Sequence, residues 1–184
     1  MFNKLLNLYT SVDSAIKEIY RQHPREIMCR PGCADCCHAV FDVSFIEAAC
    51  LAAYLKENQH LVVQQAKIAS EAAVEFEKCL KNNEDLSTKR IRCPLLGDND
   101  LCLAHPFRPV NCRTYGTPTV INGKAHVCGL SGFDNSLRYP SVYLEPLQKS
   151  LVEYSTELVG SEFGTRRYPI AWVILRLEYF LPKK

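Results

Sequence analysis

The segment Cys29–Cys37 constrains this chain more than any other, because it places four cysteines within nine residues. Between them lie Pro31, which fixes its own φ, and Gly32, which accepts the positive φ of a tight turn. Short spacings between cysteines allow two sulfur atoms to reach one metal ion. We therefore expect this segment to form a metal-binding turn that the rest of the chain holds in place.

The number of cysteines also needs an explanation, since the chain has ten of them in 184 residues. Residues 1–10 lack the pattern of a signal peptide, because polar residues interrupt their apolar positions, and we expect a cytoplasmic protein. Disulfides rarely persist in a reducing cytosol, where clustered thiols more often bind metal. Metal or iron–sulfur ligation is therefore the preferred interpretation.

The composition is that of an ordinary globular protein, with 47% hydrophobic and 23% charged residues. The formal net charge of +2 does not indicate a nucleic-acid partner. No apolar run reaches the roughly 18 residues of a membrane span, so we expect no membrane partner. The remaining candidates for a partner are a protein or a small-molecule substrate, which the sequence does not identify.

Hydrophobic periodicity predicts a mainly α-helical single domain over residues 1–184. Ser44 and Glu47 form a capping-box pattern at the start of one helix, and Gly160 is a stop signal for another. Pro169 suits the start of the last helix. The helices are expected over residues 4–22, 44–57, 60–81, 145–159 and 170–180.

A second cysteine-rich segment, residues 89–130, is expected to be irregular apart from one small β-hairpin. The Asn122-Gly123 pair is a strong two-residue turn signal between two short strands. The second strand leads directly to Cys128. We expect the two cysteine-rich segments to meet in an irregular metal-binding core over about residues 27–130.

Eight of the ten cysteines are candidate metal ligands. Cys50 and Cys79 fall inside expected helices, where cysteine packs as a small apolar residue. Eight thiolates suffice for two tetrahedral zinc sites, two iron–sulfur clusters or one polynuclear centre. Because neighbouring side chains diverge along the backbone, we expect Cys36 and Cys37 to serve different metal atoms. The candidate ligands are Cys29, Cys33, Cys36, Cys37, Cys93, Cys102, Cys112 and Cys128.

Basic residues near the cysteines are candidates for contacts to the centre, because a metal held by four thiolates carries net negative charge. We interpret Arg113, which directly follows Cys112, as a cofactor- or substrate-binding residue. His105 and His38 are alternative ligands, although eight cysteines already complete two sites. The other basic residues beside the cysteines are Arg30, Arg90, Arg92 and Arg108.

The arrangement of these residues resembles the YkgJ-type cysteine-cluster family. That family is described as a zinc- or iron-chelating domain and is similar to part of the flagellin lysine N-methylases. The resemblance covers about residues 27–130 and implies metal binding, with His105 standing where many members carry tyrosine. The matching pattern is Cys29-x3-Cys33-x2-Cys36-Cys37, Cys93-Pro-Leu, Cys102, Arg108-Pro109-x2-Cys112-Arg113-x-Tyr115 and Cys128.

Functions from different classes are compatible with these features. The first is an iron–sulfur oxidoreductase or a protein-modifying, methylase-like enzyme. The second is a structural zinc-binding module whose helices contact a protein partner, and the third is metal delivery or storage. The sequence does not choose between zinc and iron, and it does not decide whether the protein is an enzyme.

Overall fold

The computed structural model describes residues 1–134 and 136–181, and the predicted mainly α-helical fold is confirmed. The α-helices are α1 (Asn3–Gln22), α2 (Phe45–Glu57), α3 (Gln59–Lys81), α4 (Val110–Thr114), α5 (Leu144–Val159), α6 (Ser161–Gly164), α7 (Ile170–Leu175) and α8 (Leu177–Phe180). Short 3-10 turns are η1 (Asp35–Cys37), η2 (Leu86–Thr88) and η3 (His105–Phe107). The strands are β1 (Asp42–Val43), β2 (Thr119–Ile121), β3 (Lys124–His126), β4 (Val142–Tyr143) and β5 (Tyr168–Pro169).

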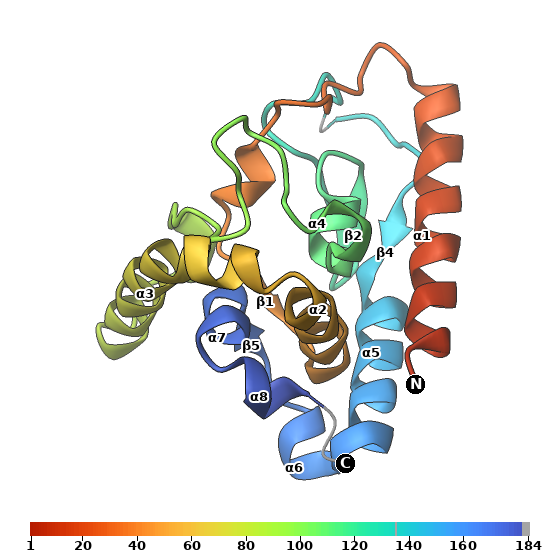
Figure 1. Ribbon diagram of the computed structural model, residues 1–184. Coiled ribbons are helices and arrows are strands. Elements are labelled where there is room, and N and C mark those ends of the chain that lie inside the picture. The colour runs from red at the N-terminus through yellow and green to blue at the C-terminus, as the bar shows by residue number, and fades with distance from the viewer. Residues whose placement is uncertain (135, 182–184) are drawn as a thin grey trace.

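Helices frame the cysteine-rich segments (Figure 1). α1 and α5 lie along one side, α3 lies on the other, and α2 and α7 lie between them. The largest apolar cluster surrounds α2, where Ala48, Leu51 and Leu55 pack with Val173 of α7. The two cysteine-rich segments cross above this layer, so the helices support them from below and from the side.

The predicted helix starts agree with the structure where local signals are strong. α1 matches the helix predicted over residues 4–22, and its apolar positions, including Leu5, Val12 and Ile16, are buried. The capping box of α2 is confirmed: the Ser44 hydroxyl accepts from the Glu47 N–H, and the Glu47 carboxylate accepts from the Ser44 N–H at 3.0 Å. These bonds satisfy N–H groups that a helix end would otherwise leave without partners.

The predicted hairpin is also confirmed, as β2 paired antiparallel with β3. Asn122 and Gly123 both take positive φ, 50° and 71°, as the tight hairpin turn requires. Two further pairings were not predicted: β4 runs parallel to β2, and β1 pairs antiparallel with β5. Both join segments that are distant in the sequence, so no local pattern indicates them.

The prediction of one continuous helix over residues 170–180 is wrong. The chain leaves helical geometry at Arg176 (φ −128°, ψ 43°), which separates α7 from α8. The break turns Phe180 into the core, where it is 1% exposed and packs against Phe45 and Tyr168. Burial of this aromatic ring favours the break over a straight helix.

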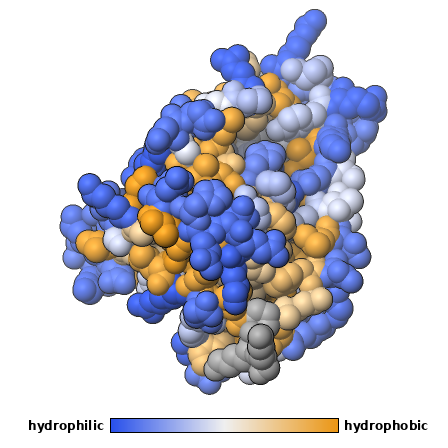
Figure 2. Space-filling model, in the orientation of Figure 1, coloured by the Kyte–Doolittle hydropathy of each residue, from blue (hydrophilic) through white to orange (hydrophobic). Residues whose placement is uncertain are grey.

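α3 presents apolar side chains to solvent as well as to the core. Val63, Val74 and Leu80 are exposed, and Figure 2 shows apolar groups on the α3 side of the molecule. The opposite stripe, which includes Ala73 and Phe76, is buried. Among the described residues, no helix combines the length and apolar character needed to cross a membrane.

Candidate metal site

Backbone contacts bring the two cysteine-rich segments together. Ala39 pairs with Arg90 in an isolated antiparallel bridge, and the Ile91 N–H donates to the His38 carbonyl at 3.0 Å. The Cys93 N–H donates to the Cys37 carbonyl at 2.6 Å. These bonds place residues 37–39 beside residues 90–93, so Cys37 and Cys93 become neighbours although they are far apart in the chain.

Most of the predicted ligands line one cavity of about 710 Å³. Cys128 is separate, in the wall of a neighbouring cavity of about 610 Å³. Phe41 and Tyr115 stand at the boundary, since both residues line the two cavities. The predicted ligands in the first cavity are Cys29, Cys33, Cys36, Cys37, Cys93, Cys102 and Cys112.

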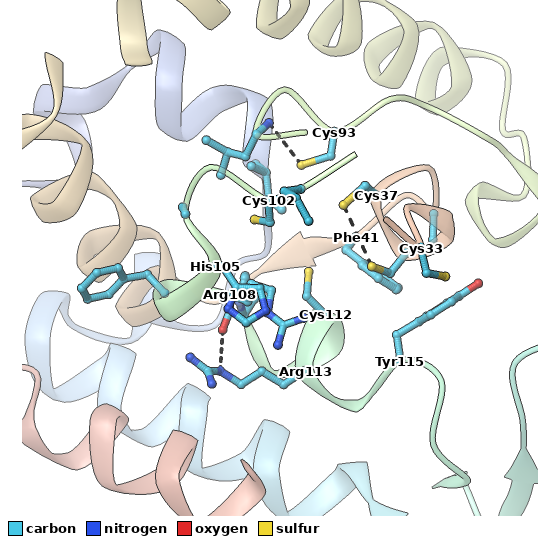
Figure 3. A pocket seen from close by; sticks show the side chains of 18 of the residues that line it. Cys33, Cys37, Phe41, Cys93, Cys102, His105, Arg108, Cys112, Arg113 and Tyr115 are labelled. Carbon is cyan, nitrogen blue, oxygen red and sulfur yellow. Dashed lines mark hydrogen bonds between the residues drawn. The ribbon is translucent and has the colours of Figure 1, made fainter. Parts of the chain in front are cut away.

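Thiols from both cysteine-rich segments face a common space (Figure 3). Cys37, Cys93, Cys102 and Cys112 direct their sulfur atoms toward one another, and Cys33 lies apart, toward Tyr115. Burial raises the pKa of the Cys112 thiol well above its usual value, and the charges of Cys93, Cys36 and Cys102 raise it further. Burial likewise raises the pKa of Cys93, to about 12. A bound cation would relieve this repulsion between thiolates.

The neighbouring Cys36 and Cys37 do not diverge as we expected. Their sulfur atoms lie 4.0 Å apart, because the backbone turns through η1 at this point. The hydrogen bond with Cys37 lowers the pKa of the Cys36 thiol to about 7, and the same bond raises the pKa of Cys37. The separation is close to the edge of about 3.8 Å that a tetrahedral site with Zn–S bonds of about 2.3 Å would have.

Backbone N–H groups point at three of the sulfur atoms. Leu95 donates to Cys93 Sγ and Leu130 donates to Cys128 Sγ, both at 3.4 Å. The pKa of Cys102 is raised mainly by burial and is lowered by a backbone hydrogen bond from Ala104. In each case the donor lies two residues after the cysteine. Such N–H donors stabilise thiolates that bind metal.

The donor set fits zinc or an iron–sulfur cluster in chemical kind, because both prefer thiolate ligands. In the described part of the chain, no group of three or more His, Cys, Asp or Glu side chains is arranged to hold a metal ion. For one ion to bind, the sulfur atoms have to approach each other by changes of side-chain rotamer.

Arg113 has a different environment from the one we predicted. Its Nε and Nη2 donate to the carbonyls of Arg108 (2.7 Å) and Pro106 (2.5 Å), and its Nη1 contacts Asp13 at 2.7 Å. The guanidinium also lies 4.0 Å from the centre of the Tyr9 ring. Each guanidinium nitrogen therefore donates to a protein oxygen. These contacts join α4 and the segment before it to α1.

Arg108 is one of the arginines that lie beside the thiols. It lines the larger cavity, and its charge lowers the pKa values of Cys36 and Cys102, although burial raises that of Cys102 overall. Its buried Nε has no hydrogen-bond partner among the described residues. The sequence placed Arg108 among the basic residues near the cysteines but gave no reason to prefer it over Arg113.

The histidines contribute little to the arrangement of thiols. His38 Nδ1 lies 3.0 Å from the Ala34 carbonyl, within the turn that carries Cys36 and Cys37. His105 lines the cavity but is largely exposed to solvent. Its partial burial and the charges of Arg108 and Arg113 lower its pKa. The structure does not bring either ring into the group formed by Cys37, Cys93, Cys102 and Cys112.

Asp35 connects the two cysteine-rich segments through hydrogen bonds that the sequence did not indicate. The Tyr115 hydroxyl donates to one carboxylate oxygen and Arg90 to the other, both at 2.5 Å. Burial acts to raise the pKa of Asp35, but these two bonds outweigh it and lower the pKa. Asp35 therefore fixes the turn with Cys36 against the segments that carry Cys93 and Cys112.

Comparison with protein-family models, curated proteins and solved structures finds no match. The resemblance to the YkgJ-type family therefore rests on the cysteine motif alone.

Proposed function

We propose that this protein binds metal, as zinc or an iron–sulfur centre, through its clustered cysteines. The observation that carries the proposal is the convergence of seven thiols on one cavity from two distant segments. Burial and mutual charge oppose thiolate formation here, and a bound cation would offset both effects. All ten cysteines are free thiols, which fits the cytoplasmic location that we also propose.

The side chains around the thiols support a reactive centre rather than an enclosed one. Tyr20, Phe41 and Arg108 share the cavity with the cysteines, which are half-buried. Its volume of about 710 Å³ is in the range of pockets that hold small molecules. When bound, an iron–sulfur cluster supplies electron transfer and zinc supplies Lewis acidity. We propose that the cavity admits a small molecule or a protein side chain to this centre.

Positive charge at the cavity supports the same proposal. Lys17, Arg30, Arg92 and Arg108 line it together with Asp100, and the carboxylate of Asp13 contacts Arg113. The cations offset the negative charge of a metal held by four thiolates. They also favour an anionic group on the substrate.

Thiol counting tests metal binding directly. Protein purified without air should react slowly with a thiol reagent, because the eight proposed ligands are occupied and Cys50 and Cys79 are buried. After a chelator removes the metal, about eight thiols should become reactive. Equal reactivity before and after chelation, in protein that analysis shows to contain no metal, would contradict the proposal.

The second candidate function is a structural zinc module. It is favoured because residues 82–118 contain little regular secondary structure. Apart from the short turns η2 and η3 and the five-residue α4, this segment has no helix. Its ties to the first cysteine segment include the bond from Cys93 to Cys37 and the bond from Tyr115 to Asp35. If the role is structural, chelation should remove amide-exchange protection from this segment while α2 and α3 remain protected.

The family resemblance is part of the proposal. The vicinal cysteines and the segment from Arg108 to Tyr115 match the YkgJ-type pattern, and they meet in the structure through Asp35 and Tyr115. Membership would extend the zinc- or iron-chelating description to this chain. A modifying reaction like that of the flagellin lysine N-methylases would be a further step, for which the cavity supplies the space.

A further inference from the structure

We propose that the larger cavity binds a small organic acid, whose carboxylate or phosphate group is held by Arg108 and Tyr20 and whose apolar part lies against the cavity wall. The proposal names the substrate class of the proposed metal centre and rests on that function. It is carried by hydrogen-bond donors that line the cavity and have no protein acceptor in the described part of the chain.

Arg108 is a half-buried cation without a protein partner. It lines the cavity, and Figure 3 shows it next to His105. Among the described residues no group accepts a hydrogen bond from its guanidinium, whose Nε is buried. A buried donor without an acceptor costs free energy, and the cost is larger when the donor is charged. An oxygen anion would supply the acceptor, since the planar guanidinium binds carboxylate and phosphate groups through two parallel N–H donors.

Three other arginines near the thiols are already bonded to protein oxygen atoms. Arg90 and Arg113 each pair with an aspartate, and Arg92 donates to a backbone carbonyl. In residues 1–134 and 136–181, by contrast, no acidic side chain pairs with Arg108 and no thiol sulfur accepts a hydrogen bond from it. Arg108 is therefore available to a ligand in a way that its neighbours are not.

α1 and the first cysteine-rich segment add further donors to the same cavity. The hydroxyl of Tyr20, a half-buried residue of α1, donates to no described residue. It lies within reach of the charge of Arg108. Lys17 and Arg30 are exposed and form no ion pair with the residues that the structure describes. Arg108 and Tyr20 are thus the inner donors, and Lys17 and Arg30 are outer cations that attract an anion toward them.

Two acidic residues also line the cavity, but they do not reverse its charge. The Asp13 carboxylate is paired with Arg113 at 2.7 Å, and Asp100 is exposed in the turn before Cys102. Basic side chains in the wall therefore outnumber acidic ones, which favours an anionic ligand over a cationic one.

The rest of the wall favours an apolar body on the acid. Ile16, Phe41 and Phe107 line the cavity. Small-molecule sites commonly combine such an apolar wall with a few polar groups that fix the orientation of the ligand, and a volume of about 710 Å³ is in their range. The ligand class is therefore a small carboxylic acid or phosphate ester with an apolar part. Because the thiols line the same cavity, this ligand would lie beside the metal.

Binding of model acids to the full-length, metal-loaded protein tests the proposal. Isothermal titration compares benzoate, phenyl phosphate and the neutral benzyl alcohol, with the metal content checked by elemental analysis. We expect at least one of the two acids to bind about tenfold more tightly than benzyl alcohol, because only an anion engages the guanidinium. The acid that binds more tightly identifies carboxylate or phosphate as the recognised group.

Three variants locate the binding site. Arg108→Gln, titrated at saturating metal, should weaken binding of the preferred acid about tenfold, and Tyr20→Phe should weaken it about threefold without loss of metal. Lys67→Gln is the matched control, because it removes one positive charge from the exposed surface of α3, outside the cavity. It should leave acid binding unchanged. If Arg108→Gln does not fold or does not load metal, Tyr20→Phe decides the test.

Several results would overturn the proposal. Metal-loaded protein that binds neither acid more tightly than benzyl alcohol would refute it and leave the proposed metal binding intact. An equal loss of affinity in Arg108→Gln and Lys67→Gln, or unchanged affinity in Tyr20→Phe, would show that the acid binds elsewhere. Protein that takes up neither zinc nor iron would overturn the proposed function, and with it the assignment of the acid as a substrate of the metal centre.

Discussion

Glu47 accepts a hydrogen bond of 2.8 Å from the backbone N–H of Val110, the first residue of α4. The same carboxylate caps α2 through Ser44, and its side chain is buried. One buried carboxylate therefore joins the frame helix α2 to the short helix that carries Cys112. A negative charge at the N-terminus of α4 also suits the unpaired N–H groups there.

We expect Glu47→Gln to weaken both the fold and the metal site. An amide keeps one acceptor oxygen and cannot satisfy the Ser44 and Val110 donors together. The free energy of unfolding should therefore fall by about 2 kcal/mol. Ser44→Ala is the control, because it removes about 1 kcal/mol of capping and leaves the bond to Val110. Urea unfolding and metal content report the two effects. Equal metal retention by both variants would show that Glu47 does not position Cys112.

Tyr115→Phe should accelerate metal loss. It removes the hydrogen bond of 2.5 Å to Asp35, which holds the turn with Cys36 and Cys37 against the second cysteine segment. Stability should fall by about 1–2 kcal/mol, as for a hydrogen bond to a charged group. Tyr143→Phe is a suitable control, since Tyr143 is exposed at 62%. Metal transfer to a coloured chelator gives the rate, and identical rates for the two variants would contradict the role of Asp35.

Substitutions at Arg108 and Arg113 should affect metal binding and the stability of the fold separately. Arg113→Gln breaks the contacts to Asp13, Arg108 and Pro106 and should cost about 2–3 kcal/mol, a value kept low because Asp13 remains in contact with water. Arg108→Gln should change the free energy of unfolding by less than about 0.5 kcal/mol. It should weaken metal binding on the order of tenfold, because the thiolates lose a nearby cation.

Thermal unfolding and competition with a chelator test this pair of predictions. The expected pattern is a lower midpoint for Arg113→Gln and weaker metal binding at an unchanged midpoint for Arg108→Gln. The reverse pattern would restore the cofactor-binding role that the sequence suggested for Arg113.

Gly116→Ala should displace the Cys29 thiol, whereas Gly123→Ala should not. Both glycines have positive φ, so both variants carry similar backbone strain of about 1 kcal/mol. At Gly123 an added Cβ meets nothing within 4 Å, whereas at Gly116 it meets Cys29 Sγ. Only Gly116→Ala should therefore lower the metal content, which elemental analysis measures. An equal loss in both variants would attribute the effect to strain alone.

Much of the helical frame follows from local signals in the sequence. The stripe from Leu5 to Ile19 defines α1, the Ser44 capping box starts α2, and Asn122-Gly123 forms the hairpin turn. Burial of Cys50 and Cys79 follows from their places within helices. In each case the physical cause acts within a few residues, so the pattern is visible in the sequence.

Features that depend on distant contacts could not be predicted in this way. The break at Arg176 follows from burial of Phe180 beside Phe45. The Arg113 guanidinium is held away from a binding role partly by its ion pair with Asp13, which lies on α1 and is far away in the sequence. Which thiols lie close together depends on how two irregular segments pack against each other. The spacing of cysteines along the chain does not determine that packing.

The most direct test of metal binding is metal and acid-labile sulfide content, together with a visible spectrum, of protein purified without air. Two outcomes agree with the account: iron with sulfide and a broad charge-transfer band, or about two zinc ions per chain without colour. Iron with sulfide would establish an iron–sulfur protein, and zinc would establish a thiolate zinc protein. Protein that is folded, colourless and free of metal, and that takes up neither zinc nor iron on reconstitution, would contradict the account.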